Sequence, residues 1–316
     1  MEFRTKISLE PEKLNSIDHR SKLLLIGSCF AENIGEKLSY FKFNNQVNPL
    51  GILFHPLAIE SLITNIINKK NYTEEEVFLH NELWNSFDAH SKLSNPSQEV
   101  VLNDLNKAIN TTYHQLVEAS HIVITLGTSW IYRHVESDKI VANCHKVPQK
   151  KFIKELLSVD EVSASLQAIV SLIKSVNPQS TLIFTVSPVR HLKDGFIENN
   201  QSKAHLLAAL HQNIDPRDQI HYFPAYELMM DELRDYRFYA DDMIHPNELA
   251  INFIWDRFSK VWMKSETHSI LKEIESIQKG LDHKPFHPES EQHLQFLNDL
   301  EQRQKQLLQQ FPYIVF

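Results

Sequence analysis

The stretch KLLLIGSCFAENIGEKL, residues 22–38, decides how this chain folds. It starts with an uninterrupted apolar run at residues 23–26, which is typical of a strand covered on both faces of a sheet. Gly27 ends the run, and apolar residues at four-residue spacing then predict one buried helix face: Phe30, Ile34 and Leu38. The stretch therefore predicts a buried strand, a tight turn and an amphipathic helix.

Two side chains that can act as nucleophiles, Ser28 and Cys29, lie in the turn between this strand and this helix. A strand-to-helix turn presents its side chains at the carboxyl edge of a sheet, where open α/β sheets bind ligands. Backbone N–H groups at a helix start favour negative charge, so we expect a lowered thiol pKa and stabilisation of an oxyanion there. A turn of small residues that only permits close backbone packing would also fit this stretch taken alone.

Further apolar runs predict more strands of the same sheet, at residues 121–126 (HIVITL), 181–186 (TLIFTV) and 220–223 (IHYF), with another strand within residues 41–47. Stretches predicted to be helical separate these strands, the last of them at residues 202–212. Alternating strands and helices predict an α/β fold, a three-layer α/β/α sandwich around a mainly parallel sheet of five strands.

The composition changes near residue 265. Residues 1–264 carry the predicted sandwich domain, whereas residues 265–316 are rich in Gln, Glu, Lys and Leu. A break at residues 283–288 (HKPFHP) and a leucine stripe beyond it predict a C-terminal helical extension, folded as a hairpin. This hairpin either packs on the domain or binds a partner.

Charge and cysteine content exclude several classes of function. The 316-residue chain has a formal net charge of −8 and no run rich in Lys or Arg, which argues against nucleic acid and anionic membrane surfaces as partners. Residues 1–13 lack the apolar core of a secretion signal, so we expect none, and no apolar run is long enough to span a bilayer. Two cysteines cannot form a disulfide framework, so we expect a cytoplasmic protein. The seventeen histidines lack HExxH or CxxC spacing, so no metal site is predicted.

A second chemical motif is DMIHP at residues 242–246. The carboxylate of Asp242 lies three residues before His245 and can reach its Nδ1–H, which fixes the tautomer and leaves Nε2 free as a base. Pro246 suits the first position of a following helix. An ordinary surface His-Pro turn is the alternative, and the nucleophile-bearing turn on the same predicted sheet favours the catalytic interpretation.

The GSCFA motif at residues 27–31 resembles the namesake motif of the GSCFA family, a bacterial group related to the SGNH (GDSL-like) hydrolases. The resemblance covers most of residues 1–264 and includes further stretches: NPLGILFHP, TLGTSWIY, ANCHKVP, SPVRHLKDGFIENNQSKAHL and DDMIHPN. It implies a flavodoxin-like sandwich with a nucleophile after the first strand. It also implies oxyanion groups in two middle loops and an Asp-x-x-His pair near the end of the domain.

The resemblance assigns catalytic residues by position. Cys29 lies where the serine of Gly-Asp-Ser is usual, and Ser28 would be the nucleophile if the register shifted by one. Gly51 matches the glycine of the second block, and the last block matches Asp242 and His245. A cysteine in place of serine would suit acyl transfer through a thioester.

The oxyanion block departs from the family pattern. Residues 127–129 match Gly-x-Asn, with Gly127 in place and Ser129 instead of asparagine. A side-chain donor is thereby lost, and Asn143 either supplies the missing amide or only lies at the exit of a hairpin. Arg190 and His191 follow a strand end, where they either contact substrate or form a salt-bridged loop.

These observations predict an esterase or acyltransferase acting on an acyl ester of a small molecule or glycan. Cys29 or Ser28 would attack the carbonyl, His245 would transfer the proton and Asp242 would orient it. No cofactor is required, although coenzyme A would be the donor in a transferase version. The alternative is a catalytically silent binding module that kept the fold. The altered Gly-Asp-Ser and Gly-x-Asn blocks favour this alternative, and the retained Asp-x-x-His pair argues against it.

Overall fold

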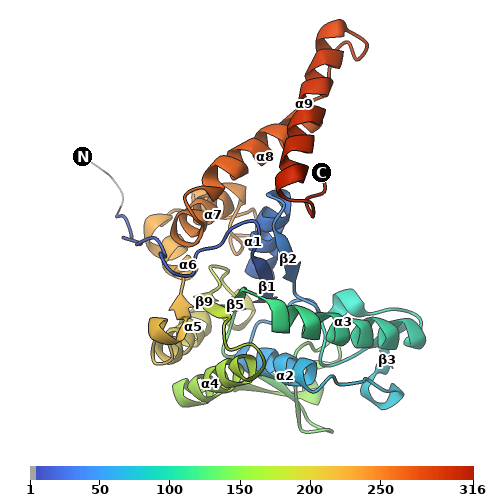
Figure 1. Cartoon of the computed structure of the whole chain (residues 1–316). Helices are drawn as coiled ribbons and strands as arrows, with labels where there is room; N and C mark the ends of the chain where they lie inside the picture. The colour runs from blue at the N-terminus through green and yellow to red at the C-terminus, as the bar shows by residue number, and fades with distance from the viewer. Residues whose placement is uncertain (1–4) are drawn as a thin grey trace.

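The apolar runs form one parallel sheet in the computed structural model, which describes residues 5–316 (Figure 1). Its five strands lie in the order β10-β9-β5-β1-β2, and all four pairings are parallel. Their bounds are β1 (Lys22–Gly27), β2 (Asn44–Val47), β5 (His121–Leu126), β9 (Thr181–Val186) and β10 (Ile220–Tyr222). The predicted five-stranded parallel sheet is confirmed.

The order of these strands fixes where a ligand can bind. Counted along the chain, the five strands are arranged 2-1-3-4-5, the flavodoxin-like order. The direction of winding reverses between β1 and β5, so the loops after these two strands diverge and leave a crevice at the carboxyl edge. The Ser28–Cys29 turn follows β1 directly and therefore lies at this switch point.

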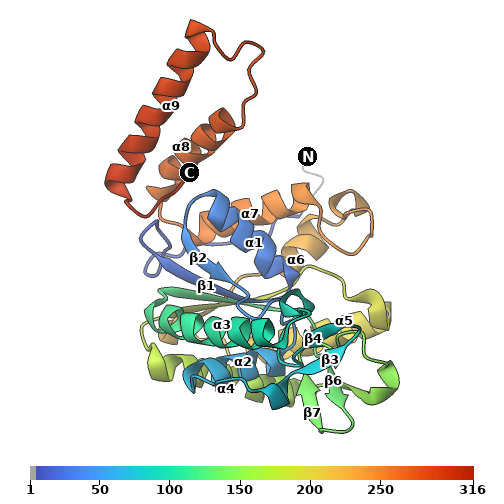
Figure 2. The same cartoon turned by 90° about the vertical axis from the view of Figure 1, so that its right-hand side faces the viewer.

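Helices cover both faces of the sheet, and Figure 2 shows the resulting three layers. One face carries α2 (Pro56–Ile67), α3 (Gln98–Glu118), α4 (Val159–Val176) and α5 (Phe196–His211), and the other carries α1 (Cys29–Tyr40), α6 (Ala225–Glu227) and α7 (Glu248–Trp262). Strand β1 serves both cores, because Leu24 and Ile26 pack toward the first set of helices while Leu23 and Leu25 pack toward the second. This two-sided burial explains the uninterrupted apolar run.

Gly27 is required where β1 turns into α1. Its φ is +143°, and a Cβ atom at this position would lie 2.1 Å from the Thr125 carbonyl oxygen of β5. The next N–H, that of Ser28, donates to the same oxygen at 3.0 Å. The turn is therefore clamped against β5 by backbone contacts that leave no room for a side chain.

Short antiparallel strands lie beyond the main sheet. A three-stranded sheet is formed by β6 (Trp130–His134), β7 (Lys139–Val141) and β8 (Phe152–Leu156), and a small hairpin by β3 (Phe78–His80) and β4 (Leu83–Asn85). The three-stranded sheet is an insertion between β5 and α4, so it grows from the carboxyl edge where the crevice lies.

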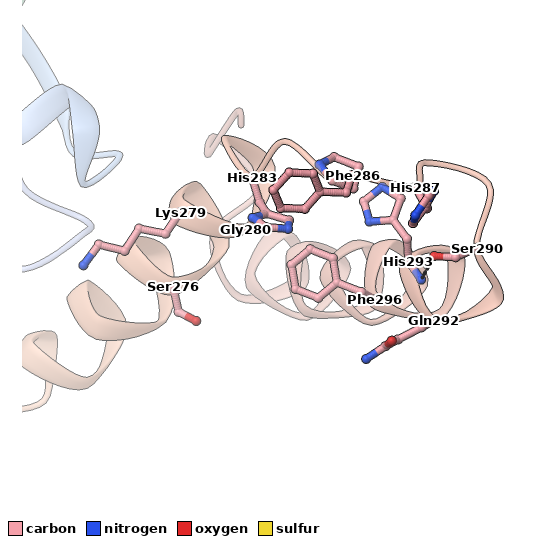
Figure 3. A pocket seen from close by; sticks show the side chains of 11 residues that line it. Ser276, Lys279, Gly280, His283, Phe286, His287, Ser290, Gln292, His293 and Phe296 are labelled. Carbon is pink, nitrogen blue, oxygen red and sulfur yellow. Dashed lines mark hydrogen bonds between the residues drawn. The ribbon is translucent and has the colours of Figure 1, made fainter.

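The C-terminal residues form a helical hairpin that projects from the sandwich (Figure 2). Helices α8 (Thr267–Leu281) and α9 (Glu291–Gln310) share a small apolar core, which includes Ile274 and Leu300. At the base, the Gln278 side chain donates to the Tyr40 carbonyl at 3.3 Å. A cavity of about 600 Å³ lies between the two helices and their connecting segment. Figure 3 shows the side chains that line it, among them Phe286 and Phe296. Among the residues described, we find no helix with both the length and the apolar character needed to cross a bilayer.

Candidate active site

Ser28 and Cys29 occupy different environments although they are adjacent. Ser28 is fully buried and is the N-cap of α1, with its hydroxyl oxygen accepting the Phe30 N–H at 3.3 Å. Cys29 is the first helical residue and is partly exposed. Of the two candidate nucleophiles, Cys29 is therefore the residue with some exposed surface, whereas Ser28 has none.

The pKa of the Cys29 thiol is raised above its ordinary value. Burial is the main cause, and the Glu32 carboxylate adds to it, whereas Lys203 and the backbone N–H groups of Cys29 and Phe30 act in the opposite direction. The expectation that the helix start lowers this pKa is therefore wrong. The helix N–H groups do favour the thiolate, but desolvation of a largely buried sulfur outweighs them.

Lys203 of α5 lies at this edge of the sheet with its ammonium group in the interior. The residue is 1% exposed, and Nζ donates to the carbonyl oxygens of Gly127 at 2.7 Å and Ser187 at 2.8 Å. These two acceptors are the first residues after β5 and β9. Burial lowers the pKa of Lys203 to about 7, and the effect of Cys29 is to raise it.

Asp242 and His245 form the hydrogen-bonded pair that their spacing predicts. His245 Nδ1 donates to Asp242 Oδ2 at 2.6 Å, while Oδ1 accepts the N–H groups of Ile244 and His245, both at 2.9 Å. These hydrogen bonds, led by the one from the His245 backbone, lower the pKa of Asp242 to about 2. Both side chains are about half exposed, so an ionised carboxylate orients an accessible imidazole whose Nε2 is left for proton exchange.

Arg190, which lies just after β9, anchors the loop that carries Asp242 and His245. Its backbone N–H donates to the Ile244 carbonyl at 3.3 Å, and Nη2 donates to the Met243 carbonyl at 2.9 Å. The guanidinium lies 4.3 Å from the ring centroid of Tyr239, within the range of a cation–π contact. The geometry gives Arg190 a positioning role toward His245.

His191 connects the pair electrostatically to Lys203. Burial, together with the charges of Lys203 and His245, lowers the pKa of His191 to about 3, so the ring is neutral. Its Nε2 is buried and finds no hydrogen-bond partner in residues 5–316. A Cβ atom on Gly127 would lie 3.0 Å from His191 Nε2, and the Gly127 carbonyl accepts from Lys203 Nζ, so both side chains lie at the end of β5. Cys29 follows β1, the strand beside β5, and His245 follows Ile244, whose carbonyl accepts the Arg190 N–H. These four side chains form one cluster at the sheet edge.

The donors expected to hold an oxyanion are engaged inside the fold. The Gly51 N–H donates to a carbonyl of its own turn at 2.8 Å, and the Gly127 N–H donates to the Phe54 carbonyl at 2.7 Å. The Ser129 side chain is fully buried, and its hydroxyl donates to the Ser202 carbonyl at 3.2 Å. In this conformation none of these three groups offers a free hydrogen to a ligand.

Asn143 lines a cavity of about 380 Å³ next to the cluster. Its Oδ1 accepts the His145 N–H at 2.8 Å, and the cavity is also lined by Phe54, Cys144 and Lys193. The cavity adjoins the cluster, because the Phe54 ring centroid lies 6.0 Å from that of His191. Burial raises the pKa of the Cys144 thiol to about 11, so this second cysteine is a poor nucleophile.

Sequence reasoning missed two residues of this region, Lys203 and Asn48. Asn48 Oδ1 accepts the Gly27 N–H at 2.8 Å, and its amide nitrogen is buried without a partner among the described residues. A signal for Lys203 existed: it stands three and seven residues before Leu206 and Leu210, so a helix places it on the apolar face, and the structure shows all three residues buried. Within residues 5–316, no group of three or more His, Cys, Asp or Glu side chains could hold a metal ion.

Comparison with known proteins places the chain in a family. Two solved structures, an acetyl esterase mutant with an acetate ion and a carbohydrate esterase family 3 protein from Talaromyces cellulolyticus, each match 81% of this chain and 99% of their own. Both are 9% identical with a TM-score of 0.38, too low to carry any conclusion about this chain. No match was found among curated proteins. The profile of the GSCFA domain protein C-terminal domain matches residues 274–316, and that of the GSCFA family matches residues 22–258. Since the latter match spans well over half of the sequence, the chain belongs to the GSCFA family.

Proposed function

We propose that this protein is an esterase or acyltransferase that acts on an acyl ester of a small molecule or glycan, with Cys29 as its nucleophile. One observation carries the proposal. The partly exposed Cys29 lies at the switch point of the sheet, and a half-exposed His245, oriented by Asp242, lies on a loop that Arg190 holds at the end of β9, on the same edge of the sheet. A nucleophile, a base and an orienting carboxylate are the groups that acyl transfer needs.

The reaction follows from these groups. Cys29 Sγ attacks the acyl carbonyl carbon, and collapse of the tetrahedral intermediate expels the alcohol and leaves a thioester on the enzyme. Water, or an acceptor hydroxyl in the transferase version, then attacks the thioester and frees the sulfur. His245 exchanges protons with the attacking and leaving groups through Nε2, while the ionised Asp242 stabilises the imidazolium.

Two donors near the turn can stabilise the oxyanion in this proposal. The backbone N–H of Cys29 lies at the start of α1, where the helix favours negative charge. The amide nitrogen of Asn48 is held beside Gly27 and has no partner within residues 5–316. An amide from this second turn would take the place of the asparagine that Ser129 replaces.

The experiment is a screen of short acyl esters and acyl-coenzyme A donors, followed by variants on the best substrate. We expect His245→Ala to lower kcat by about 10²–10⁴-fold, the range for loss of a general acid–base group, and Cys29→Ala to abolish turnover. Cys144→Ala is the matched control and should keep its rate. Full activity of His245→Ala on a verified substrate would reject the catalytic assignment.

A catalytically silent binding module is the second candidate. It is favoured by the engaged hydrogens of Gly51, Gly127 and Ser129 and by the raised pKa of the Cys29 thiol. The two candidates differ in whether an acyl group ever reaches the sulfur. Mass spectrometry of the protein after incubation with activated acyl donors should show an acyl adduct on Cys29 for the enzyme and none for the binding module.

A further inference from the structure

Lys203 is an anomaly that the proposed function does not use. A fully buried lysine normally pairs with a carboxylate, because an isolated ammonium is costly to remove from water. Both hydrogen-bond acceptors of Lys203 Nζ are main-chain carbonyls instead, those of Gly127 and Ser187. These carbonyls hold the amine in place but carry no charge to offset its own.

The position of the amine is set by the sheet. Gly127 and Ser187 directly follow two neighbouring strands, β5 and β9, and β5 pairs on its other side with β1, which ends at the Ser28–Cys29 turn. The amine therefore lies at the carboxyl edge beside the switch point. Gly27 pairs in register with Thr125, so Cys29 and Gly127, each two residues further on, leave neighbouring strand ends, and the Gly127 carbonyl is the one that accepts from the amine.

We propose that the amine of Lys203 accepts the proton of the Cys29 thiol when the sulfur attacks the acyl carbonyl. This inference rests on the proposed role of Cys29 as nucleophile. It changes one part of that mechanism: Lys203 takes over from His245 the proton transfers that form the thioester, and His245 keeps those of its breakdown.

The proton and electron pairs balance in each half. The S–H bond of Cys29 breaks and an N–H bond forms on Lys203 Nζ, while the C–S bond forms and the carbonyl oxygen becomes an oxyanion beside the new ammonium. On collapse the ester C–O bond breaks, and its oxygen takes the proton back from Nζ. His245 then removes a proton from water or an acceptor hydroxyl as it attacks, and returns it to the departing sulfur.

The burial of the two groups suits this exchange. Burial raises the pKa of the thiol and lowers that of the amine to about 7, so both groups are neutral just above neutral pH. A neutral amine can accept a proton, which an ammonium of ordinary pKa could not do. Moving the proton from sulfur to nitrogen also leaves the net charge of the buried site unchanged.

The first test measures the thiol without any substrate. The rate constant for alkylation of Cys29 by iodoacetamide is followed at pH 7.5 by peptide mass spectrometry, with Cys144 as internal reference. We expect Lys203→Met to slow alkylation of Cys29 about tenfold or more, because the thiolate loses the amine that takes its proton and that, once protonated, stabilises it. The control is Lys260→Met, an exposed lysine of α7, which should leave the rate unchanged. An unchanged rate in folded Lys203→Met would overturn the inference.

A second test leaves Lys203 intact, in case its replacement prevents folding. Side-chain NMR of ¹³C-lysine-labelled protein should show one lysine that titrates near pH 7, and Cys29→Ala should move this titration to lower pH. A lysine titration that does not respond to Cys29→Ala would contradict the coupling. Neither measurement needs an ester, so the two proposals can fail separately. A wild-type protein that is inactive on every ester tested would reject the proposed function. The alkylation and titration results would still decide whether Lys203 and Cys29 are coupled.

Discussion

Replacing Ser28 and Cys29 one at a time should separate a structural role from a catalytic one. Ser28→Ala removes the N-cap of α1, whose hydroxyl oxygen accepts the Phe30 N–H at a long 3.3 Å. Loss of a cap costs about 0.5–2 kcal/mol, and the long bond argues for about 1 kcal/mol here. In a domain of this size, such a loss lowers Tm by about 2–4 °C. Turnover should persist, because this buried hydroxyl does not meet substrate.

Cys29→Ala should give the reverse pattern. Its stability should stay within about 1 kcal/mol of wild type, since the side chain is partly exposed and alanine suits a helix start, whereas turnover should vanish. Cys29→Ser should be weak or inactive, because the site would be tuned for sulfur. The assay is urea unfolding of each variant alongside its kcat/KM on the best ester from the screen. A dead Ser28→Ala together with an active Cys29→Ala would refute the assignment and make Ser28 the nucleophile.

Two further predictions concern stability. The His55 ring is buried at the start of α2, and burial lowers its pKa to about 4. Between pH 6.5 and 4 the unfolded chain therefore binds this proton more readily than the folded protein does. The free energy of unfolding should fall by about 3 kcal/mol as the pH falls through this range. Urea unfolding at pH 7.5 and 4.5 should show that His55→Asn, which keeps a capping side chain, loses less over this range; an equal loss would contradict the idea. Gly27→Ala should lose several kcal/mol, because its Cβ would lie 2.1 Å from the Thr125 oxygen at a φ of +143°. At Gly280 an added Cβ would instead meet the end of the Leu300 side chain, which can move, so Gly280→Ala should destabilise the protein far less. Similar Tm values for the two variants would contradict the argument that contact with the Thr125 backbone makes Gly27 necessary.

The fold was predictable because its strands are buried on both faces. Long apolar runs mark β5 and β9 as clearly as β1, and the helices between them dictate parallel pairing. The limits of elements were less predictable. Helix α5 begins at Phe196, earlier than the predicted residues 202–212, because its first turns mix polar and exposed residues. Strand β8 (FIKEL) was missed, since its short mixed sequence shows no long apolar run and its partner β6 decides its conformation.

The pair Asp242–His245 was predictable for a different reason. Its geometry is local: the three-residue spacing and the two N–H groups that the carboxylate accepts all lie within one turn of chain. The oxyanion donors were not local in this sense. Whether the hydrogens of Gly51 or Ser129 are free depends on carbonyls that other parts of the fold bring to them, and no motif reports that.

The chemistry of Cys29 shows where motif reasoning stops. A helix start predicts a lowered thiol pKa from local N–H groups alone, but desolvation by the surrounding layers has the stronger effect and raises the pKa instead. Lys203 can offset this cost, and it belongs to α5, on the opposite face of the sheet from α1. Its amine is held by the carbonyls of Gly127 and Ser187, which are 76 and 16 residues away in sequence. Burial opposes a charge on either group taken alone, yet a proton that moves from sulfur to nitrogen creates both charges together, and each then stabilises the other. A thiol that burial alone would make inert can thus become reactive through its neighbouring amine.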